Sequence, residues 1–325
     1  DLRSSSMPGS LVELSLANNK YLDRVDLIEF KNLEKLNLGR CGFVDMKLSK
    51  LPEFLIELSL HGNRYLQTVD LSEYSNLKKL TLFGCNLKDL GGLKFPSSLA
   101  VLNLGKNKKL VRVELKNLPN LEKLALFDSG IESLRLTDLP ELVEVLLSDN
   151  KNLGDVEIKG LKKLGKLDLS RCALTTIHME DLPGLTELDL GKNSLLTEFD
   201  FKGFSNLKKL DLSFCGLKEV NSLKLPPSLY ELLLYGSTEL VKVDLAGFEN
   251  LKNLQLNGCP IKSLKLWDLP GLLELSINGN RNLVEVDLRG LPALKSLALP
   301  DCDIQSLALG ELPELSDVNL NFSRN

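Results

Sequence analysis

Hydrophobic residues recur along the whole chain with a spacing of 21 or 22 residues. Each repeat opens with Leu-x-x-Leu-x-Leu, as in Leu272, Leu275 and Ile277, and a second apolar triplet follows in its second half. We call one repeat a coil and count positions from its first leucine, so that +4 is the residue four after it. The first leucines are residues 11, 33, 55, 77, 99, 121, 142, 164, 185, 207, 229, 251, 272, 294 and 315.

The spacing inside a coil predicts strands and little helix. Apolar residues two apart indicate short strands with one inward face, and neither half of a coil leaves room for a helix of ordinary length. The chain is therefore expected to be mostly β: a solenoid of about fifteen coils with a parallel main sheet and a second sheet of short strands. Residues 87–95 and 217–225 stretch their coils and predict bulges.

The same pattern bears on domain organisation. A solenoid grows by adding coils, so residues 1–325 are expected to form a single domain. Residues 1–10 match the tail of a preceding coil, and residues 315–325 begin a coil that is not finished. Terminal coils normally carry polar caps, and we recognise none. We therefore expect a fragment of a longer protein with flanking domains.

Position +8 alternates between asparagine and cysteine in successive coils, with Ser129, Ser237 and Ser323 as exceptions. A buried asparagine amide can bond the backbone groups that turns leave without partners. Cysteines in alternate coils would lie about 10 Å apart, beyond the reach of a disulfide. Six reduced, buried thiols and a cytoplasmic location are therefore expected, while an extracellular location stays open. The cysteines are Cys41, Cys85, Cys172, Cys215, Cys259 and Cys302.

Charged residues at +2 also alternate, as in Glu187 and Lys209, and predict an in-register ladder of opposite charges. The second strands alternate in a similar way, beginning with Asp26, Lys47 and Asp70. The same column includes His178, which is therefore a poor catalytic candidate. Such exposed pairs are expected to define register more than to add stability.

Composition excludes several classes of function. The net charge of −4 without a basic cluster argues against nucleic-acid binding. No apolar run reaches the roughly 18 residues of a membrane span. The cysteines lack the close pairs of zinc sites, so no metal or cofactor is expected. Residues 160–166 imitate a phosphate-binding loop, but Leu167 stands where a hydroxyl is needed. We find no catalytic signature and expect no enzyme.

The spacing Leu-x-x-Leu-x-Leu-x-x-Asn/Cys, as in residues 185–193 (LTELDLGKN) and 207–215 (LKKLDLSFC), resembles the leucine-rich repeat family over essentially the whole chain. The resemblance implies an arc or horseshoe with the parallel sheet on its concave side, used mainly to bind other proteins. The subfamily stays open: the cysteines resemble the cysteine-containing class, and a second strand in place of a helix resembles the internalin-like bacterial repeats. Plant immune receptors and bacterial effectors are both candidate owners.

Outward residues at +4 and +6 are mostly small or polar, and the departures from that rule are the candidate binding residues. Exposed apolar groups often mark binding sites, and like charges on adjacent strands cost stability that the chain avoids elsewhere. Random variation on an exposed face, or contact with a neighbouring domain, would explain them equally. The candidates are His61, Phe83, Phe127, Leu146, Asp168, Asp189, Asp211, Phe214, Leu233 and Tyr235.

The functional hypothesis is a protein–protein recognition module, the ligand-sensing or partner-binding part of a larger receptor or effector, for example in immunity. Its partner would be a protein or peptide on the concave face that offers basic groups to the aspartates. One alternative is the targeting domain of an enzyme whose catalytic domain lies outside this chain. Another is a structural or adhesive solenoid.

Overall fold

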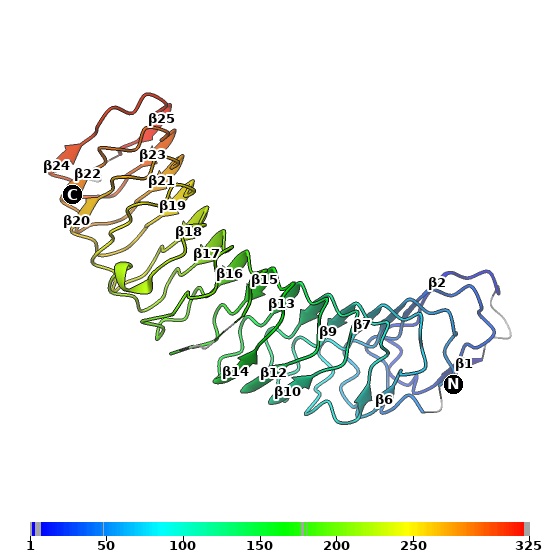
Figure 1. The fold of residues 1–325 in the computed structure, drawn as a ribbon. Helices are drawn as coiled ribbons and strands as arrows, with labels where there is room; N and C mark the ends of the chain where they lie inside the picture. The colour runs from blue at the N-terminus through cyan, green and yellow to red at the C-terminus, as the bar shows by residue number, and fades with distance from the viewer. Residues whose placement is uncertain (1, 4–7, 48, 177–178, 180, 322–325) are drawn as a thin grey trace. The chain divides into compact units, whose positions relative to one another are not determined.

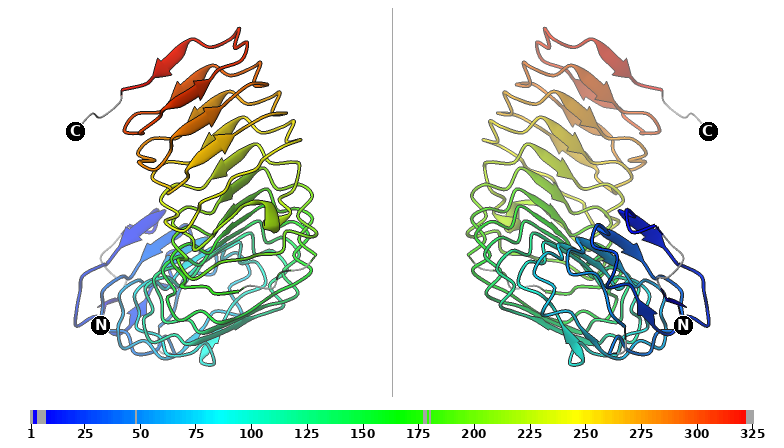
Figure 2. Two further views of the ribbon diagram at one scale, coloured as in Figure 1. Left: turned by 90° about the vertical axis from the view of Figure 1, so that its left-hand side faces the viewer. Right: turned by 90° about the vertical axis from the view of Figure 1, so that its right-hand side faces the viewer.

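The computed structural model describes residues 2–3, 8–47, 49–176, 179 and 181–321. The chain divides into two compact units, Asp1–Leu164 and Gly165–Asn325, and each is described by itself. In both units each coil adds one strand to a parallel main sheet, and successive strands stack in a row (Figures 1 and 2). The predicted parallel β-solenoid is confirmed. The assignment of one domain stays a prediction.

Every described main-sheet strand begins two residues after a first leucine, as the spacing predicts. In the first unit these strands are β2 (Glu13–Ser15), β4 (Lys35–Asn37), β5 (Glu57–Ser59), β7 (Lys79–Thr81), β9 (Val101–Asn103), β11 (Lys123–Ala125) and β13 (Glu144–Leu146). In the second unit they are β15 (Lys166–Asp168), β16 (Glu187–Asp189), β17 (Lys209–Asp211), β18 (Glu231–Leu233), β19 (Asn253–Gln255), β21 (Glu274–Ser276), β23 (Ser296–Ala298) and β25 (Asp317–Asn319).

The second sheet is less regular than predicted, because it is broken into short groups. Among the described residues the first unit has β1 (Leu2–Arg3) with β3 (Val25–Asp26), β6 (Val69–Asp70) with β8 (Leu93–Lys94), and the three-stranded group β10 (Arg112–Leu115), β12 (Ser133–Leu136) and β14 (Asp155–Ile158). The second unit has β20 (Ser263–Lys265), β22 (Glu285–Asp287) and β24 (Ser306–Ala308). Second half-coils differ in length, so their backbones do not all align for ladder hydrogen bonds.

Two local predictions for the second strands are wrong. Asp26 bridges to Lys50, 3.1 Å between the charged groups, where the sequence pattern favoured Lys47. Residues 217–225 form no simple bulge, because the extra residues wind into a 3₁₀ turn, η1 (Asn221–Leu223). Leu223 remains buried, so the turn takes up the extra length without losing the core contact. His178 lies outside the described residues.

The hydrophobic core consists of stacked leucine rows. Within one coil the first leucine and those at +3 and +5 are almost completely buried, as Leu207, Leu210 and Leu212 show at 0, 1 and 0% exposure. Each such side chain contributes about 1.5–3 kcal/mol by leaving water. Since a coil meets only its neighbours, this burial depends on stacking and extends along each unit.

Buried asparagines at +8 tie neighbouring coils together. Asn193 donates through Nδ2 to the Leu190 oxygen of its own coil (2.7 Å) and the Leu169 oxygen of the preceding coil (3.0 Å). Its Oδ1 accepts the N–H groups of Cys172 and Leu174, each at 3.0 Å. The same bridging between a coil and its predecessor recurs at Asn63, Asn107, Asn150 and Asn280.

The cysteines occupy the same column with a weaker bond. Cys215 Sγ lies 3.3 Å from the Leu190 carbonyl oxygen of the preceding coil. All six cysteines are free and buried, which confirms that part of the thiol prediction. Burial raises the pKa of Cys215 to about 12 and the pKa values of Cys85 and Cys259 to about 11, so these thiols are protonated at neutral pH.

After each main strand from β2 to β23 the chain turns through a left-handed residue at +7. Across the described coils this residue has φ between 52° and 69°. Glycine, asparagine and aspartate tolerate this conformation best, and other side chains are uncommon in it. The residues are Asn18, Arg40, Gly62, Gly84, Lys106, Asp128, Asp149, Arg171, Lys192, Phe214, Gly236, Gly258, Gly279 and Asp301.

A second asparagine ladder was missed by the sequence analysis. Asn206 stands just before a first leucine and donates Nδ2 to the Pro183 oxygen of the preceding coil at 2.8 Å. Asn120 donates to the Ser97 oxygen at the same distance. Further members of the ladder are Asn32, Asn76 and Asn250. Their hydrogen bonds hold the exposed corner where one coil leads into the next.

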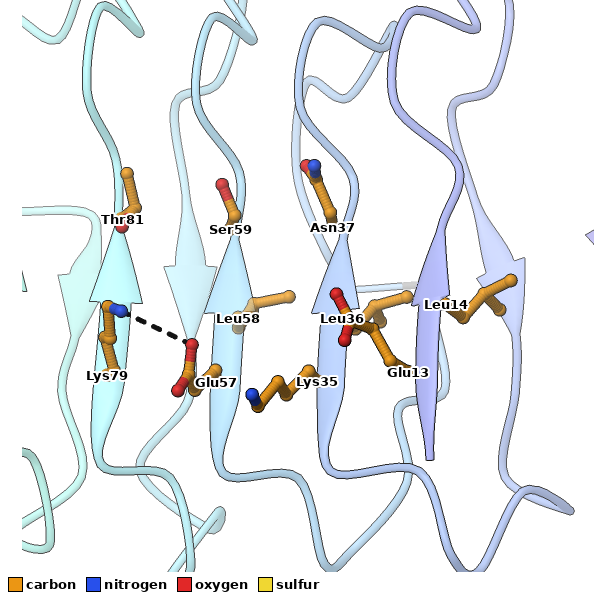
Figure 3. Close-up of a pocket in the computed structure, with 10 residues that line it drawn as sticks. All are labelled: Glu13, Leu14, Lys35, Leu36, Asn37, Glu57, Leu58, Ser59, Lys79 and Thr81. Atoms are coloured by element: carbon orange, nitrogen blue, oxygen red, sulfur yellow. Dashed lines mark hydrogen bonds and ion pairs between the residues drawn. The ribbon is translucent and has the colours of Figure 1, made fainter. Parts of the chain in front are cut away.

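The predicted +2 charge ladder is confirmed by the register of the main sheet. Glu187 pairs with Lys209 in register, and Lys209 with Glu231. Ion pairs form at Lys79–Glu57 (3.4 Å, Figure 3) and at Lys123–Glu144 (3.1 Å). These groups are largely solvent-exposed, so each pair contributes at most about 1 kcal/mol.

Native thiol labelling tests the cysteine column. The thiolate is the reactive form, so buried thiols with raised pKa values should react slowly with maleimide in the folded protein and completely after denaturation. Cys41 is the most exposed at 8% and should react first. Peptide mapping by mass spectrometry gives the order. Rapid native labelling of Cys215, or a disulfide in unreduced protein, would contradict this arrangement.

Candidate binding surface

The outward face of the main sheet is formed by side chains at +2, +4 and +6, because neighbouring residues in a strand point to opposite sides. In the first coils this face is polar and shallow. Glu13, Lys35, Glu57 and Lys79 run along it beside smaller +4 residues, around a depression of about 180 Å³ (Figure 3). Such a depression is too small for most organic ligands, which occupy about 300–1,000 Å³.

Aromatic residues change the character of this face further along the first unit. The rings of Phe83 and Phe127 lie 5.9 Å apart between centroids, and Lys106 Nζ lies 5.4 Å from the Phe83 centroid. Leu146 belongs to the strand after Phe127, in register with Ala125. Phe83, Phe127 and Leu146 are half-buried. The three side chains form an apolar patch. An aromatic pair at the separation of Phe83 and Phe127 contributes about 0.5–1.5 kcal/mol of stability beyond that of the buried area.

His61 has a structural environment. Its Nδ1 lies 2.9 Å from Ser59 Oγ, and the ring is half-buried. Burial, and secondarily the charge of Arg40, lower the pKa of His61 below its ordinary value of 6.5. The ring is therefore predominantly neutral at pH 7 and offers a polar, uncharged edge on this face.

In the second unit three aspartates at +4 form one column. Asp168 pairs in register with Asp189, and Asp189 with Asp211, as predicted. Each carboxylate Oδ1 accepts the N–H two residues later: Ser170 at 2.9 Å, then Gly191 and Ser213 at 2.8 Å. The column therefore caps the strand ends, as Asn37 and Asn103 do in the first unit. Sequence analysis identified the column but missed this role.

Asp189, the central residue of the Asp column, is destabilised in its charged form. Burial raises the pKa of Asp189 to about 6, and the negative charges of Asp211 and Asp168 add to the shift, against the Gly191 N–H bond and the charge of Lys166. Charging Asp189 is therefore unfavourable in the folded protein. Like charges on adjacent strands repel, and an asparagine would cap the strand without that cost.

Aromatic and apolar groups adjoin the Asp column. Asp211 is in register with Leu233. The rings of Phe214 and Tyr235 meet edge to face, 5.3 Å between centroids, and Lys192 Nζ lies 5.5 Å from the Phe214 centroid. Phe214 leans over Gly236, where an added Cβ would come within 2.3 Å of the ring. Phe214 is 42% exposed and sits in the left-handed +7 position, with φ 55°.

The structure thus places the candidate residues in separate groups. Phe83, Phe127 and Leu146 share the first unit with His61. The other group contains the Asp column with Leu233, Phe214 and Tyr235. Sequence analysis missed Lys106 and Lys192, whose signal was their shared +7 position beside an aromatic ring. Among the described residues no cluster of three or more His, Cys, Asp or Glu side chains could hold a metal ion.

Comparison with known proteins supports the predicted repeat. A family model for the Leucine Rich Repeat matches residues 206–232, which include β17 and the first two residues of β18. No curated protein matches the sequence significantly. In the described part of the chain, no helix is long and apolar enough to cross a membrane.

Several solved leucine-rich repeat structures resemble the chain. YopM, a leucine-rich effector protein of Yersinia pestis, is 23% identical with a TM-score of 0.70, over 98% of this chain and 85% of YopM. The functional domain of InlJ from Listeria monocytogenes, described as including a cysteine ladder, is 23% identical with a TM-score of 0.64, over 90% of this chain and 59% of InlJ.

TLR13, solved in complex with ssRNA13, is 21% identical with a TM-score of 0.56, over 94% of this chain and 60% of TLR13. The chain therefore spans less than two thirds of the InlJ and TLR13 chains. At these identities the likeness shows the fold. The chain contains a leucine-rich repeat and has the leucine-rich repeat fold, as the spacing of its leucines predicted.

The substitution Asp189→Asn tests the cost of the Asp column. Asparagine keeps the hydrogen bond from the Gly191 N–H and removes the charge. The variant should therefore be more stable at pH 7 by about 1 kcal/mol of unfolding free energy, because solvent screens part of the effect of the pKa shift. Because the folded pKa is raised, protonation stabilises the native protein below about pH 4, and this contribution disappears as pH rises through about 6. The advantage of the variant should therefore fade between pH 6 and pH 4.

Urea unfolding of both proteins at pH 7 and pH 4 measures the difference. Asp200→Asn is the matched control, because Asp200 Oδ1 caps the Lys202 N–H at 2.8 Å in the second half of a coil. Its effect should be the smaller of the two. An Asp189→Asn variant less stable than wild type at pH 7 would contradict the proposed repulsion.

Proposed function

We propose that this leucine-rich repeat solenoid is a protein-recognition module that binds its partner on the outward face of the main sheet. The fold is typically a recognition scaffold without catalysis, and we propose the same for this chain. The proposal extends to a role as the sensing part of a larger receptor or effector. The buried, protonated thiols support a reducing compartment.

Phe214 carries the proposal. A bulky side chain in the left-handed region is strained, and such strain costs about 1–3 kcal/mol. At +7, the described coils otherwise carry glycine, asparagine, aspartate, lysine or arginine. Burial does not offset the cost, since the Phe214 side chain remains 42% exposed. Strained residues of this kind concentrate at functional sites, and half-exposed aromatic groups commonly anchor protein interfaces.

The same face carries a second aromatic group in the first unit. Phe83 and Phe127 are held against each other with Lys106 over one ring, so both anchors are ordered before a partner arrives. Preorganised anchors lose little entropy on binding. An adhesive solenoid without a discrete partner would not require strained or preorganised aromatic residues on one face.

Paired surface variants test the location of the binding face. Phe83→Ser with Phe127→Ser alters the first aromatic group, and Asp189→Ser with Tyr235→Ser alters the second. The control is Tyr21→Ser with Tyr65→Ser, because these tyrosines are 96% and 74% exposed but lie beyond the main strands. The purified wild-type chain serves as bait, the retained protein is identified, and its affinity for each variant is measured by calorimetry.

Each face variant should weaken binding by about 2–4 kcal/mol, as expected for interface anchors, while the tyrosine control stays near wild type. Thermal unfolding of each variant confirms that the fold is intact. Loss of affinity in the control alone would move the binding surface away from the main sheet. Equal affinity in all variants would mean that the partner binds outside all of these residues, and retention of no protein by the wild-type chain would favour a role outside partner recognition.

A further inference from the structure

The carboxylates of Asp189 and Asp211 converge over Gly191. A Cβ added to Gly191 would lie 3.1 Å from Asp189 Oδ1 and 3.2 Å from Asp211 Oδ1. The two carboxylates therefore approach the same point from neighbouring strands, and glycine leaves the room for it. Each Oδ1 accepts a hydrogen bond from a backbone N–H: Gly191 for Asp189 and Ser213 for Asp211.

The charge of this pair is poorly compensated within the protein. Neither Asp189 nor Asp211 forms an ion pair with another described residue. Asp168 adds a third negative charge, and Lys192 lies over the Phe214 ring. Burial is the main cause of the raised pKa of Asp189, and the charges of Asp211 and Asp168 add to it, while the charge of Lys166 opposes it. A cation from outside would relieve the repulsion.

A second observation marks the same place. Ser213 is 1% exposed, and its Oγ is buried without a hydrogen-bond partner among the described residues. Its backbone N–H donates to Asp211 Oδ1, so Ser213 adjoins that carboxylate through its main chain. In the equivalent position Ser170 Oγ donates to Asp168 Oδ1 at 2.7 Å. An orphaned buried hydroxyl costs about 1–3 kcal/mol, and a small rotation of Ser213 would supply a bond to a ligand held at Asp211.

Apolar groups begin one coil further along. Leu233 is in register with Asp211, and Tyr235 contacts Phe214 edge to face. Adjacent strands of a sheet are about 4.8 Å apart, so the centre of the Asp189–Asp211 pair lies about 7 Å from the Leu233 strand. Residues i and i+2 of an extended peptide are separated by about 6.6–6.8 Å. The spacing fits one extended segment lying across the strands.

We propose that this patch binds an extended segment of a partner protein, with an arginine guanidinium between Asp189 and Asp211 and an apolar side chain two residues later on Leu233 and Tyr235. The inference rests on the proposed function and names the chemistry of its partner. A planar guanidinium can donate to both carboxylates at once, whereas an ammonium is a compact point charge. A nucleic-acid backbone is disfavoured because its phosphates would face three aspartates.

A defined peptide provides the test. The probe is acetyl-Gly-Arg-Gly-Leu-Gly-amide, added to the folded 325-residue chain while the amide NMR signals of Gly191 and Ser213 are followed. Control peptides replace arginine with citrulline, which has the same shape without the charge, or leucine with serine. We expect saturable shifts with the arginine peptide. The citrulline peptide should bind at least about tenfold more weakly, because it loses the charged hydrogen bonds between the guanidinium and the carboxylates.

Protein variants separate recognition from general charge. Asp189→Asn with Asp211→Asn keeps both backbone caps and should weaken the arginine peptide at least about tenfold. Lys192→Gln removes a positive charge near the site and should strengthen binding of the positively charged arginine peptide. Asp200→Asn, the distant control, should leave affinity unchanged. Binding should also weaken as pH falls through about 6, since Asp189 then takes up a proton.

Equal binding of the arginine and citrulline peptides, or no shift at Gly191 and Ser213 up to the solubility limit, would overturn this inference. So would an oligouridine that shifts these amides when the arginine peptide does not. If the peptide fails while capture of a protein still depends on Phe83 and Tyr235, the proposed function stands and only the arginine assignment is lost. If the peptide binds but protein capture does not depend on the outward residues of the main sheet, the arginine assignment stands and the proposed function is lost.

Discussion

The buried asparagine at +8 is the interaction on which the rest of the solenoid depends. Asn193 forms hydrogen bonds with four backbone groups that no strand ladder reaches, one in its own coil and three in the preceding coil. Cys215, in the following coil, offers its neighbour a thiol bond instead. Strong and weak links thus alternate, which explains in physical terms why the sequence unit is a pair of coils. One asparagine satisfies the turns on both sides of the interface that it bridges.

With the coils held from inside, the outward residues of the main sheet are free to vary. Glu57 and Lys79 at +2 keep neighbouring strands in register, whereas a +4 residue needs only to cap its strand end, as the uncharged Asn37 does. Departures from small or polar side chains at +4 and +6 accordingly need another explanation. The Asp column shows that the two kinds of explanation coexist, because each carboxylate caps a strand end and still adds to a repulsion that Asn37 avoids. In our proposal recognition accounts for the charge, whereas capping accounts for the position.

Features set by residues close together in the sequence could be predicted, whereas features set by contacts between coils could not. Leucine spacing is a local signal that determines which side of a strand is buried, so main strands such as β17 lie where expected. The pairing of Asp26 with Lys50 depends on the length and path of the neighbouring second half-coil. No single residue in either half-coil determines that length. Ring contacts such as Phe214 with Tyr235 depend on a left-handed backbone at +7, a recurrence visible in the sequence only as a loose preference for glycine and polar residues.

Urea unfolding of Asn193→Leu tests the central claim most directly. Leucine fills a similar volume but leaves several buried backbone groups without partners, so the variant should lose more than about 3 kcal/mol of unfolding free energy. Asn206→Leu removes a single 2.8 Å bond at an exposed corner and should lose less than about 1.5 kcal/mol. An Asn193→Leu variant as stable as Asn206→Leu would contradict the account, because stacking of the leucine rows would then suffice to hold the coils together.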